Sequence, residues 1–415
     1  MTVARLTKLS TAVSVSALLV FGGSALAADI TIENLNVSKP DGKSTAIIKK
    51  IVATNTNISK DELTKLFMPD TSKEDRLAIT SKMKADLLSI PSIEVTRKDQ
   101  EGKITLSGIA VTKIDAGKFA KASLEGLNGG GETKKGEGNF TIKSGPLVLE
   151  NGDVSHALNA VKNGDITDGT WRVGKVSWSN FEIVVPEKKG GDIHYHTFKV
   201  GSVSGTAKYE GNIPVDSTVA FNDMVFIPGP NSQAGQGMAA FGYKQVNVGL
   251  TMTGVYDVKA KNYKLTDFTI KGKDAAVLSI AGVFGNIDPA AFTGDKRQRM
   301  MAMMGGDVDD LKIKVVNNGL LDKALVFFAR MKGAQPDAIK QQWAGMAGQM
   351  LPMVLGGDSS ALQSAAAVSE FIKSPKNLEI NASGKAGPVH FMSFAGMKNP
   401  MQLFSKVKVE VVANR

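Results

Sequence analysis

The residues best suited to chemistry are two histidines that lie close together in the chain. His194 and His196 are separated by one residue, and Asp192 precedes them at the same spacing. Side chains two positions apart in a strand share a face, so these three could offer two imidazoles and a carboxylate to a metal ion. The chain has four histidines and no cysteine, and no second cluster completes such a ligand set. We therefore predict no metal site and expect these residues to lie exposed on the solvent face of a strand.

A second pattern, Ser81-Lys82-Met83-Lys84, matches the S-x-x-K nucleophile motif of penicillin-binding proteins and serine β-lactamases. Those enzymes also need a K-T-G strand, and the sequence contains no such tripeptide. We interpret the match as a chance occurrence on an amphipathic helix. The adjacent carboxylates Asp309-Asp310 and Asp61-Glu62 fall at expected starts of helices or strands, where capping and solvation explain them. The sequence therefore predicts no catalytic residue and no cofactor, and a hydrolase with an unrecognised site stays an alternative.

Methionine is concentrated in one part of the chain. Eight of the 17 methionines lie between Met300 and Met353, among them the spaced Met346 and Met350. Flexible thioethers line surfaces that accept varied apolar shapes, and they are also soft ligands for Cu(I). Three readings stay open: ordinary helix core, the wall of a lipid groove, and copper binding.

The first 27 residues have the pattern of a bacterial secretory signal peptide. Arg5 and Lys8 precede an uncharged apolar run from Ala12 to Phe21, and Ala25-Leu26-Ala27 provides an A-x-A cleavage site. An uncleaved anchor would need ~20 apolar residues, about twice the length of this run. We predict cleavage before Ala28 and a periplasmic protein.

The net charge of +10 comes from interleaved acidic and basic residues, so we expect no nucleic-acid partner.

An eight-residue phrase recurs through the chain and predicts its strands. ITIENLNV returns as ITLSGIAV, VSWSNFEI, VAFNDMVF and YKLTDFTI, with apolar residues at positions 1, 3, 6 and 8. A β-bulge at the break in phase would keep all four on one face, and the residue that absorbs it often needs positive φ. Position five carries Asn34, Gly108, Asn180, Asp223 and Asp267. The alternative is two short strands joined by a tight turn.

Helix signals interrupt these strands in two regions. Ser59 to Ile90 reads as two helices, the first opened by a capping box of Ser59 and Glu62. Further helices are predicted at Asn317–Gly333, Pro336–Leu355 and Ser359–Ser374, with strands at Leu311–Val316, Leu378–Ser383 and Val407–Val412. The fold class is therefore α+β: a long, curved antiparallel β-sheet with an N-terminal helical insertion and a helical C-terminal subdomain. The predicted organisation is a signal peptide at 1–27, a sheet domain at 28–300 with the insertion at 59–90, and a subdomain at 301–415.

The recurrent phrase, together with NNGLLDKAL, an apolar helical pair and FIKSPKNLEI, resembles bacterial envelope proteins of the YdgA-like and AsmA-like kind. The resemblance implies long antiparallel sheets and, from the AsmA-like members, a hydrophobic groove for lipid. It transfers no catalytic residue. The chain departs from AsmA-like proteins in its modest length and in having no N-terminal transmembrane helix.

These observations predict an exported, non-enzymatic envelope protein that binds or shields an amphiphile such as lipid, or assists assembly of the outer envelope. Envelope proteins are possible further partners. The ligand-binding residues are predicted to be Phe181, Ile183, Phe226, Phe268, Met346 and Met350. A structural or protein-interaction module that uses exposed strand edges is the alternative from another class.

Overall fold

The structure is a computed structural model that describes residues 27–39, 42–97, 101–133, 136–155, 171–395 and 401–415. Apart from Ala27, the predicted signal peptide lies outside the described residues. The chain forms two compact units: unit 1 comprises residues 1–131 and 146–173, and unit 2 comprises residues 132–145 and 174–415. The boundary predicted near residue 300 lies inside unit 2.

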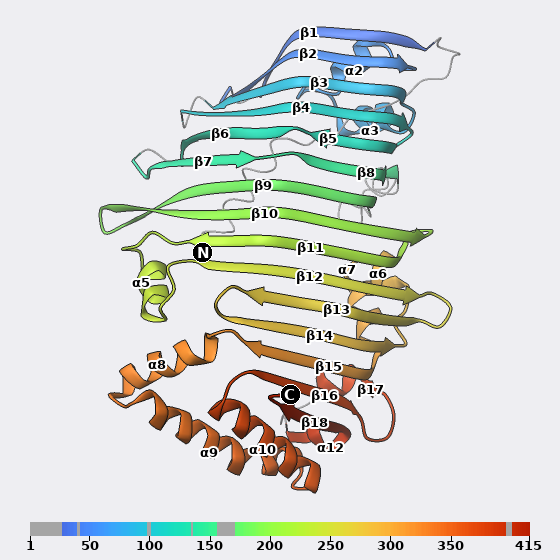
Figure 1. Ribbon diagram of the computed structural model, residues 1–415. Helices are drawn as coiled ribbons and strands as arrows, with labels where there is room; N and C mark the ends of the chain where they lie inside the picture. The colour runs from blue at the N-terminus through green and yellow to red at the C-terminus, as the bar shows by residue number, and fades with distance from the viewer. Residues whose placement is uncertain (1–26, 40–41, 98–100, 134–135, 156–170, 396–400) are drawn as a thin grey trace. The chain divides into compact units, whose positions relative to one another are not determined.

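Unit 1 is an antiparallel sheet in which most strands pair with their neighbours in sequence (Figure 1). Its strands are β1 (Ala28–Ser38), β2 (Ser44–Thr56), β3 (Lys84–Arg97), β4 (Gly102–Asp115), β5 (Lys118–Leu124), β6 (Gly126–Glu132) and β8 (Leu147–Asp153). The first four pair in chain order; β4 then pairs with both β5 and β6, and β5 pairs with β8. Most of these connections are short, as in a meander; the exception is the segment between β2 and β3, which contains two helices.

A row of isoleucines crosses the first four strands next to the point where the alternation of apolar residues is interrupted. The row consists of Ile32, Ile51, Ile90 and Ile109, which are between 0% and 8% exposed. The next inward row consists of Leu35, Ile48, Ile93 and Leu106. In every strand two residues separate the rows, so the strands kink together and the ladder keeps its register.

Two short helices cover this face of unit 1. α2 (Lys60–Lys65) has the predicted capping box of Ser59 and Glu62, and α3 (Lys73–Thr80) follows. Leu63 of α2 and Ile79 of α3 belong to the same buried cluster as the isoleucine row. The predicted helix up to Ile90 is wrong after Thr80, because Lys84–Arg97 forms β3, whose backbone pairs with β2 and β4.

Unit 2 continues the antiparallel pattern with longer strands. They are β7 (Asn139–Ser144), β9 (Arg172–Lys189), β10 (Asp192–Glu210), β11 (Ile213–Ile227), β12 (Val246–Asp257), β13 (Asn262–Gly272), β14 (Ala276–Gly285), β15 (Asp307–Asn317), β16 (Asn377–Gly384), β17 (Val389–His390) and β18 (Val407–Ala413). β9 pairs with β7 and β10, and β10 to β16 pair in chain order. β15 also pairs with β17, and β16 pairs with β18.

The predicted positive φ is confirmed at four of the five phrase positions. Asn34, Gly108, Asn180 and Asp223 have φ values of 55°, 62°, 53° and 52°, whereas Asp267 does not have positive φ. All five phrases lie inside continuous strands, so the two-strand alternative is wrong. The predicted β-bulge is confirmed where β11 and β13 pair with β12, because the register shifts by one residue there. It is absent at the kinks of the β1–β2, β3–β4 and β9–β10 pairs, where the register continues without a shift. In those pairs the partner strand kinks at the same level.

The helices of unit 2 gather mainly in its C-terminal part. They are α5 (Gln233–Ala240), α6 (Ala290–Thr293), α7 (Lys296–Met304), α8 (Leu320–Lys332), α9 (Pro336–Leu355), α10 (Ser359–Lys373), α11 (Met392–Ala395) and α12 (Met401–Lys406). α8 to α10 form where predicted, and α8 ends at Gly333 with φ 62°. The chain is thus an α+β protein dominated by antiparallel β-structure. Among the described residues, no helix is long and apolar enough to cross a membrane.

Candidate binding face of unit 2

One face of β9 to β13 carries apolar side chains in successive rows. The strand registers form a first row of Ile183, Phe198 and Phe226, a second of Phe181, Val200 and Met224, and a third of Trp178, Val203 and Phe221. On the neighbouring strands, Leu250 of β12 extends the third row by pairing with Phe221, and Met252 of β12 pairs with Phe268 of β13 in the row after it. We call these twelve residues the apolar face.

Ring contacts show that rows on both sides of the kink share this face. Trp178 and Phe181 flank Ser179 and Asn180, yet their ring centroids lie 4.9 Å apart. Phe181 also meets Phe198 of β10 edge-on, with centroids 6.4 Å apart. Strict alternation would place Trp178 and Phe181 on opposite faces, so the left-handed conformation of Asn180 is what unites them.

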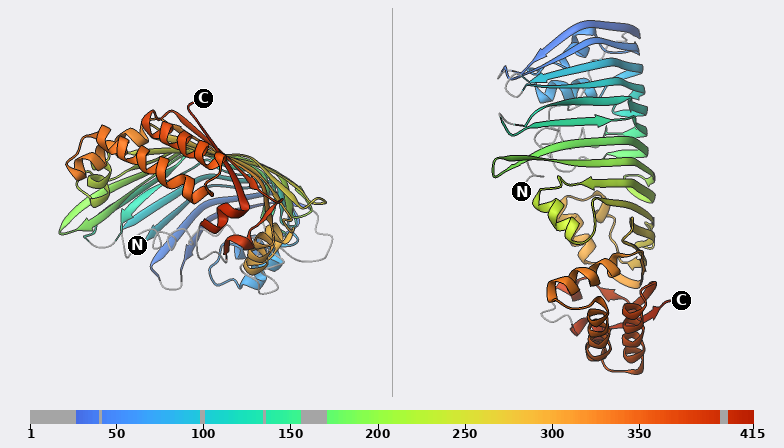
Figure 2. Two further views of the ribbon diagram at one scale, coloured as in Figure 1. Left: turned by 90° about the horizontal axis from the view of Figure 1, so that it is seen from below. Right: turned by 60° about the vertical axis from the view of Figure 1, so that its left-hand side comes forward.

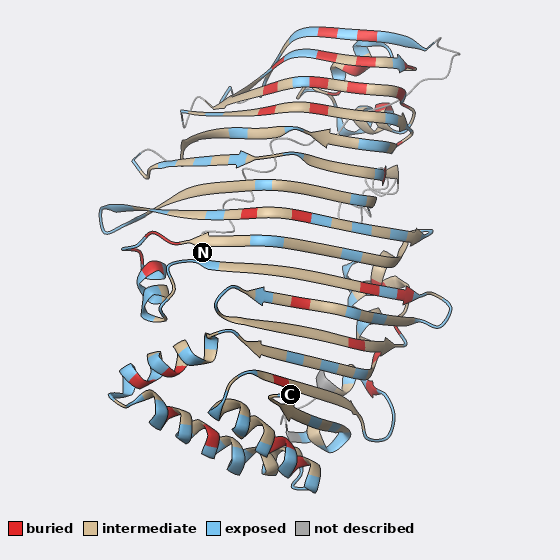
Figure 3. Ribbon diagram, viewed as in Figure 1, coloured by how far each residue is buried: buried red, intermediate tan, exposed pale blue. Residues whose placement is uncertain are grey.

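The apolar face is much less buried than its counterpart in unit 1. Among its twelve residues only Val200 and Val203 are buried, at 6% and 9% exposed, and Phe198 is 39% exposed. In unit 1 the rows covered by α2 and α3 include Ile51 at 0% exposed. Figure 3 shows this contrast: buried positions recur along β1 to β4, while β9 to β14 are mostly intermediate. The same kind of strand therefore keeps its apolar side accessible in unit 2.

Helices do cover one end of the strands in unit 2. Tyr256 of β12 packs with Ile287 and Ala291. The ring centroids of Tyr256 and of Phe292 on α6 lie 4.7 Å apart. The Tyr256 hydroxyl donates to the Ile287 carbonyl at 2.6 Å. Burial raises the pKa of Tyr256, and the carboxylates of Asp288 and Asp257 add to that rise. This end is a closed core, in contrast to the apolar face beside it.

His196 lies on the apolar side of β10, so the prediction that it is exposed on the solvent face is wrong. Its ring stacks on Phe226 with centroids 6.0 Å apart, and its side chain is 12% exposed. Nε2 lies 3.0 Å from Glu187 Oε2, and Nδ1 accepts the Gly229 N–H at 3.3 Å. Both ring nitrogens thus have partners. In the part of the chain that the structure describes, no group of three or more histidine or acidic side chains could hold a metal ion.

The structure brings together some of the predicted site residues and separates others. Ile183 and Phe226 occupy one row, and Phe181 lies in the next. Phe268 points to the same side but pairs with Met252 of β12, three rows away from the row that contains Phe226. Met346 and Met350 lie on α9, where they are 48% and 52% exposed and belong to no described core cluster.

Two residues that the sequence reading missed lie at the centre of the face. Trp178 is held by a hydrogen bond from its Nε1 to Ser144 Oγ of β7, 2.6 Å long. Phe198 sits between Ile183 and Phe226 in the register. The phrase VSWSNFEI contained Trp178, and its position three would have identified it. Phe198 stands in a strand without the phrase, so only the pairing of β10 reveals its place.

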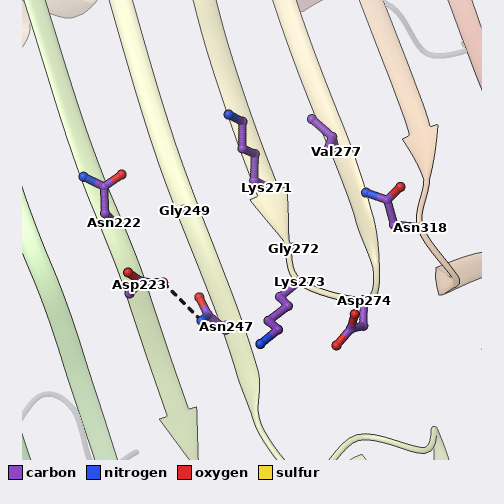
Figure 4. A pocket seen from close by; sticks show the side chains of 10 residues that line it. All are labelled: Asn222, Asp223, Asn247, Gly249, Lys271, Gly272, Lys273, Asp274, Val277 and Asn318. Carbon is purple, nitrogen blue, oxygen red and sulfur yellow. Dashed lines mark hydrogen bonds between the residues drawn. The ribbon is translucent and has the colours of Figure 1, made fainter.

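The opposite, polar side of the strands carries a shallow cavity of about 500 Å³ (Figure 4). Its lining includes Asn222, Asn247, Lys271, Lys273 and Asp274. The Asn247 amide donates to Asp223 Oδ1 at 3.3 Å, and both lysines are exposed. This surface suits water and polar groups. It is distinct from the apolar face because residues such as Asn222 and Gly249 alternate with Phe221 and Leu250 along their strands.

The S-x-x-K match has no nucleophile geometry. Ser81 follows α3 and its hydroxyl donates to the Leu77 carbonyl at 2.9 Å. Lys84 begins β3, and its Nζ pairs with Asp115 Oδ1 at 3.1 Å on an exposed surface. The motif therefore straddles a helix end and a strand start, and the expectation that it lies on a helix is wrong.

Comparison with known proteins adds little to this geometry. Residues 269–414 match a family described as an uncharacterized protein. No curated protein matches the chain. The matched segment runs from the second half of β13 to β18 and includes the helices α6 to α12, so all twelve residues of the apolar face lie outside it.

Proposed function

We propose that the apolar face of unit 2 binds the acyl chain of a lipid or a similar envelope amphiphile and shields it from water. The observation that carries this proposal is the difference in burial between the strands of unit 1 and those of unit 2, which are built in the same way. Rows beneath α2 and α3 are nearly inaccessible, while most side chains in the aromatic rows of β9 to β11 are only partly buried and Phe198 is exposed.

The energetics favour a ligand on this face. Burying a fully exposed aromatic or branched aliphatic side chain stabilises by about 1.5–3 kcal/mol, so completing the burial of several partly covered side chains gives a fraction of that for each, summed over the face. The face is lined by carbon, with the indole of Trp178 already hydrogen-bonded to Ser144. It therefore has shape and apolarity but few polar groups, which suits a chain rather than a headgroup.

The wider role in the proposal is that of an exported, non-enzymatic periplasmic protein that carries or shields lipid, or assists outer-envelope assembly. The signal-peptide pattern and the resemblance to AsmA-like proteins support it. Sequencing the amino terminus of protein isolated from the envelope should show Ala28 first; retained Met1 would contradict export by cleavage. The rival reading, a module that binds through strand edges, predicts no lipid affinity.

Trp178 provides a direct reporter for the test. The chain has three tryptophans, and Trp343 packs in a separate cluster with Leu325 while Trp171 is 66% exposed. In a Trp171→Phe/Trp343→Phe background, a fatty acid brominated along its chain should quench the remaining fluorescence at micromolar concentration. Bromine quenches at short range, so quenching reports a chain lying on the apolar face.

Matched variants decide whether the chain binds where we propose. Phe198→Asp and Phe226→Asp should weaken quenching strongly, because each places a carboxylate within the rows. Tyr195→Asp is the control: Tyr195 is 48% exposed on the opposite face of β10, three residues before Phe198 in the same strand. Circular dichroism must show all three folded. Absence of quenching, or equal quenching in folded Phe198→Asp, would replace this proposal with the strand-edge module.

A further inference from the structure

The α9–α10 hairpin exposes a surface that is apolar and nearly free of charge. Between Gln341 and Ser369 the one charged residue is Asp358, in the turn. Met346, Met350 and Met353 follow one another on one face of α9 and are 48%, 52% and 67% exposed. Leu362, near the start of α10, is 57% exposed. A helix surface facing water normally carries charged side chains, so this surface indicates contact with an apolar phase.

The hairpin is held rigidly, so these side chains are presented at a fixed tip. α9 packs along α10, and α10 packs on β18 (Figure 2). The turn consists of Gly356 and Gly357, with φ values of 104° and 75°, which other residues rarely adopt. Asp358 then caps α10 by accepting the Ala361 N–H at 2.8 Å. The outward exposure of Met353 and Leu362 therefore belongs to an ordered element.

Basic side chains flank the tip on the side of β18. Lys385 and Lys408 line a cavity of about 200 Å³ together with Leu355 and Asp358 of the hairpin. The Lys385 N–H donates to the Lys406 carbonyl at 2.8 Å, so the backbone of a third lysine lies next to Lys385. The local carboxylates are Asp358 and Glu410, the latter 2.6 Å from Lys408 Nζ. The exposed Lys406 adds a positive charge next to this pair, so three lysines lie near two carboxylates, and one of those carboxylates already pairs with Lys408.

We propose that this tip docks on the surface of a membrane that contains anionic lipid. Met350, Met353 and Leu362 enter the boundary between headgroups and acyl chains, while Lys385 and Lys408 meet a lipid phosphate at the cavity. Apolar side chains beside lysines are the combination that binds an anionic membrane without spanning it. The charge of the chain is +10 with the predicted signal peptide included, and it stays positive without Arg5 and Lys8, which favours the same partner. This docking surface is separate from the apolar face and does not depend on it.

Flotation of the full chain with vesicles tests the proposal. Vesicles of phosphatidylethanolamine with phosphatidylglycerol should carry the protein upward, and vesicles of phosphatidylcholine alone should carry much less. Met350→Asp/Met353→Asp should weaken binding by about tenfold or more, because two carboxylates would have to enter the interface. Lys385→Gln/Lys408→Gln should weaken binding to the anionic vesicles by about fivefold per lysine, and less at high salt.

The matched control lies on another methionine-rich helix. Met300 and Met301 of α7 are 60% and 63% exposed and lie beside Lys296 and Arg297, so Met300→Asp/Met301→Asp introduces the same charge at similar exposure. This control should bind as the unmodified chain does. Phe226→Asp should also float normally, which separates docking from the proposed lipid-binding face.

Three results would overturn the proposal. One is normal flotation of folded Met350→Asp/Met353→Asp; another is an equal loss in the α7 control. The third combines two findings: the unmodified chain does not bind vesicles, and it self-associates in analytical ultracentrifugation without vesicles. Met350→Asp/Met353→Asp would abolish that self-association. In that case a second copy of the chain covers the tip.

Discussion

The hydroxyl of Ser364 on α10 completes the backbone hydrogen bonding of Val411 on β18. The Val411 N–H donates to Ser364 Oγ at 3.2 Å, and that hydroxyl lies 3.3 Å from the Val409 carbonyl to which it donates. Ser364 is 2% exposed. A strand edge with free N–H and C=O groups would invite pairing with another chain, so α10 closes this edge with a side chain. The closure weighs against binding through β18.

Replacing Ser364 should lower the free energy of unfolding. Ser364→Ala leaves the part-buried Val411 N–H without its partner and leaves the Val409 carbonyl with only the longer contact from Ser360, so it should cost about 1–3 kcal/mol in the free energy of unfolding. Ser360→Ala is the control, because Ser360 Oγ lies 3.5 Å from the same carbonyl and is the weaker donor. Urea denaturation should rank the two variants in that order. Equal midpoints would mean that Ser364 does not close the edge.

The left-handed residue in β9 should tolerate glycine but not a branched side chain. Asn180 has φ 53°, so Asn180→Val forces a β-branched residue into a sparsely allowed region and should cost roughly 1–3 kcal/mol. Asn180→Gly should be nearly neutral because glycine adopts this conformation freely. Ser179→Val, next to it, should matter much less. Thermal denaturation that shows the same midpoint for both valine variants would refute the kink as the cause.

Isoleucines in covered and uncovered rows should differ in their contribution to stability. Ile51 is 0% exposed beneath α2 and α3, so Ile51→Ala should destabilise by about 2–5 kcal/mol. Ile183 lies on the half-exposed apolar face, and Ile183→Ala should cost about 1 kcal/mol or less, since less apolar area leaves water on folding. Chemical denaturation without ligand measures both. Comparable losses would show that the apolar face is covered in solution.

The carboxylate of Glu62 should make unit 1 weaker in acid. Burial alone would raise the pKa of Glu62, but the Ser59 N–H at 2.8 Å and then Lys82 at 3.1 Å outweigh it and lower the pKa below 4.5. A lowered pKa in the folded state means that this stabilisation is complete above pH 4.5 and is lost as the pH falls through the lowered value.

Glu62→Gln removes the titrating group while its amide oxygen can still accept the Ser59 N–H. The variant should therefore lose less stability than the unmodified chain when urea midpoints are compared at about pH 6 and about pH 3. Asp61→Asn, at an exposed neighbouring position, should leave the pH dependence unchanged. An identical acid response in Glu62→Gln would show that the pair with Lys82 contributes nothing.

Local signals sufficed for the elements whose ends are set by nearby residues. α9 spans Pro336 to Leu355 as predicted, because proline opens a helix well and Gly356 ends it in a left-handed conformation. The same reasoning failed at Lys84–Ile90, where Leu87 and Leu88 fit either a helical or an extended period. Pairing with β2 and β4 decided between the two, and both partners are distant in sequence.

The sequence by itself determined the strands that carry the recurrent phrase, four of their five left-handed positions and the side that carries apolar residues, since spacing and residue type act over a few positions. It did not determine that the kinks align across neighbours, because alignment depends on the register of separate strands. The tertiary structure alone decided which apolar rows are covered: α2 and α3 fold back over Ile51, while Phe198 receives no such cover. It also decided that Met350 and Met353 face outward on α9, away from any described core. Burial depends on contacts between distant segments, and a repeated phrase reads the same whether or not a helix lies over it.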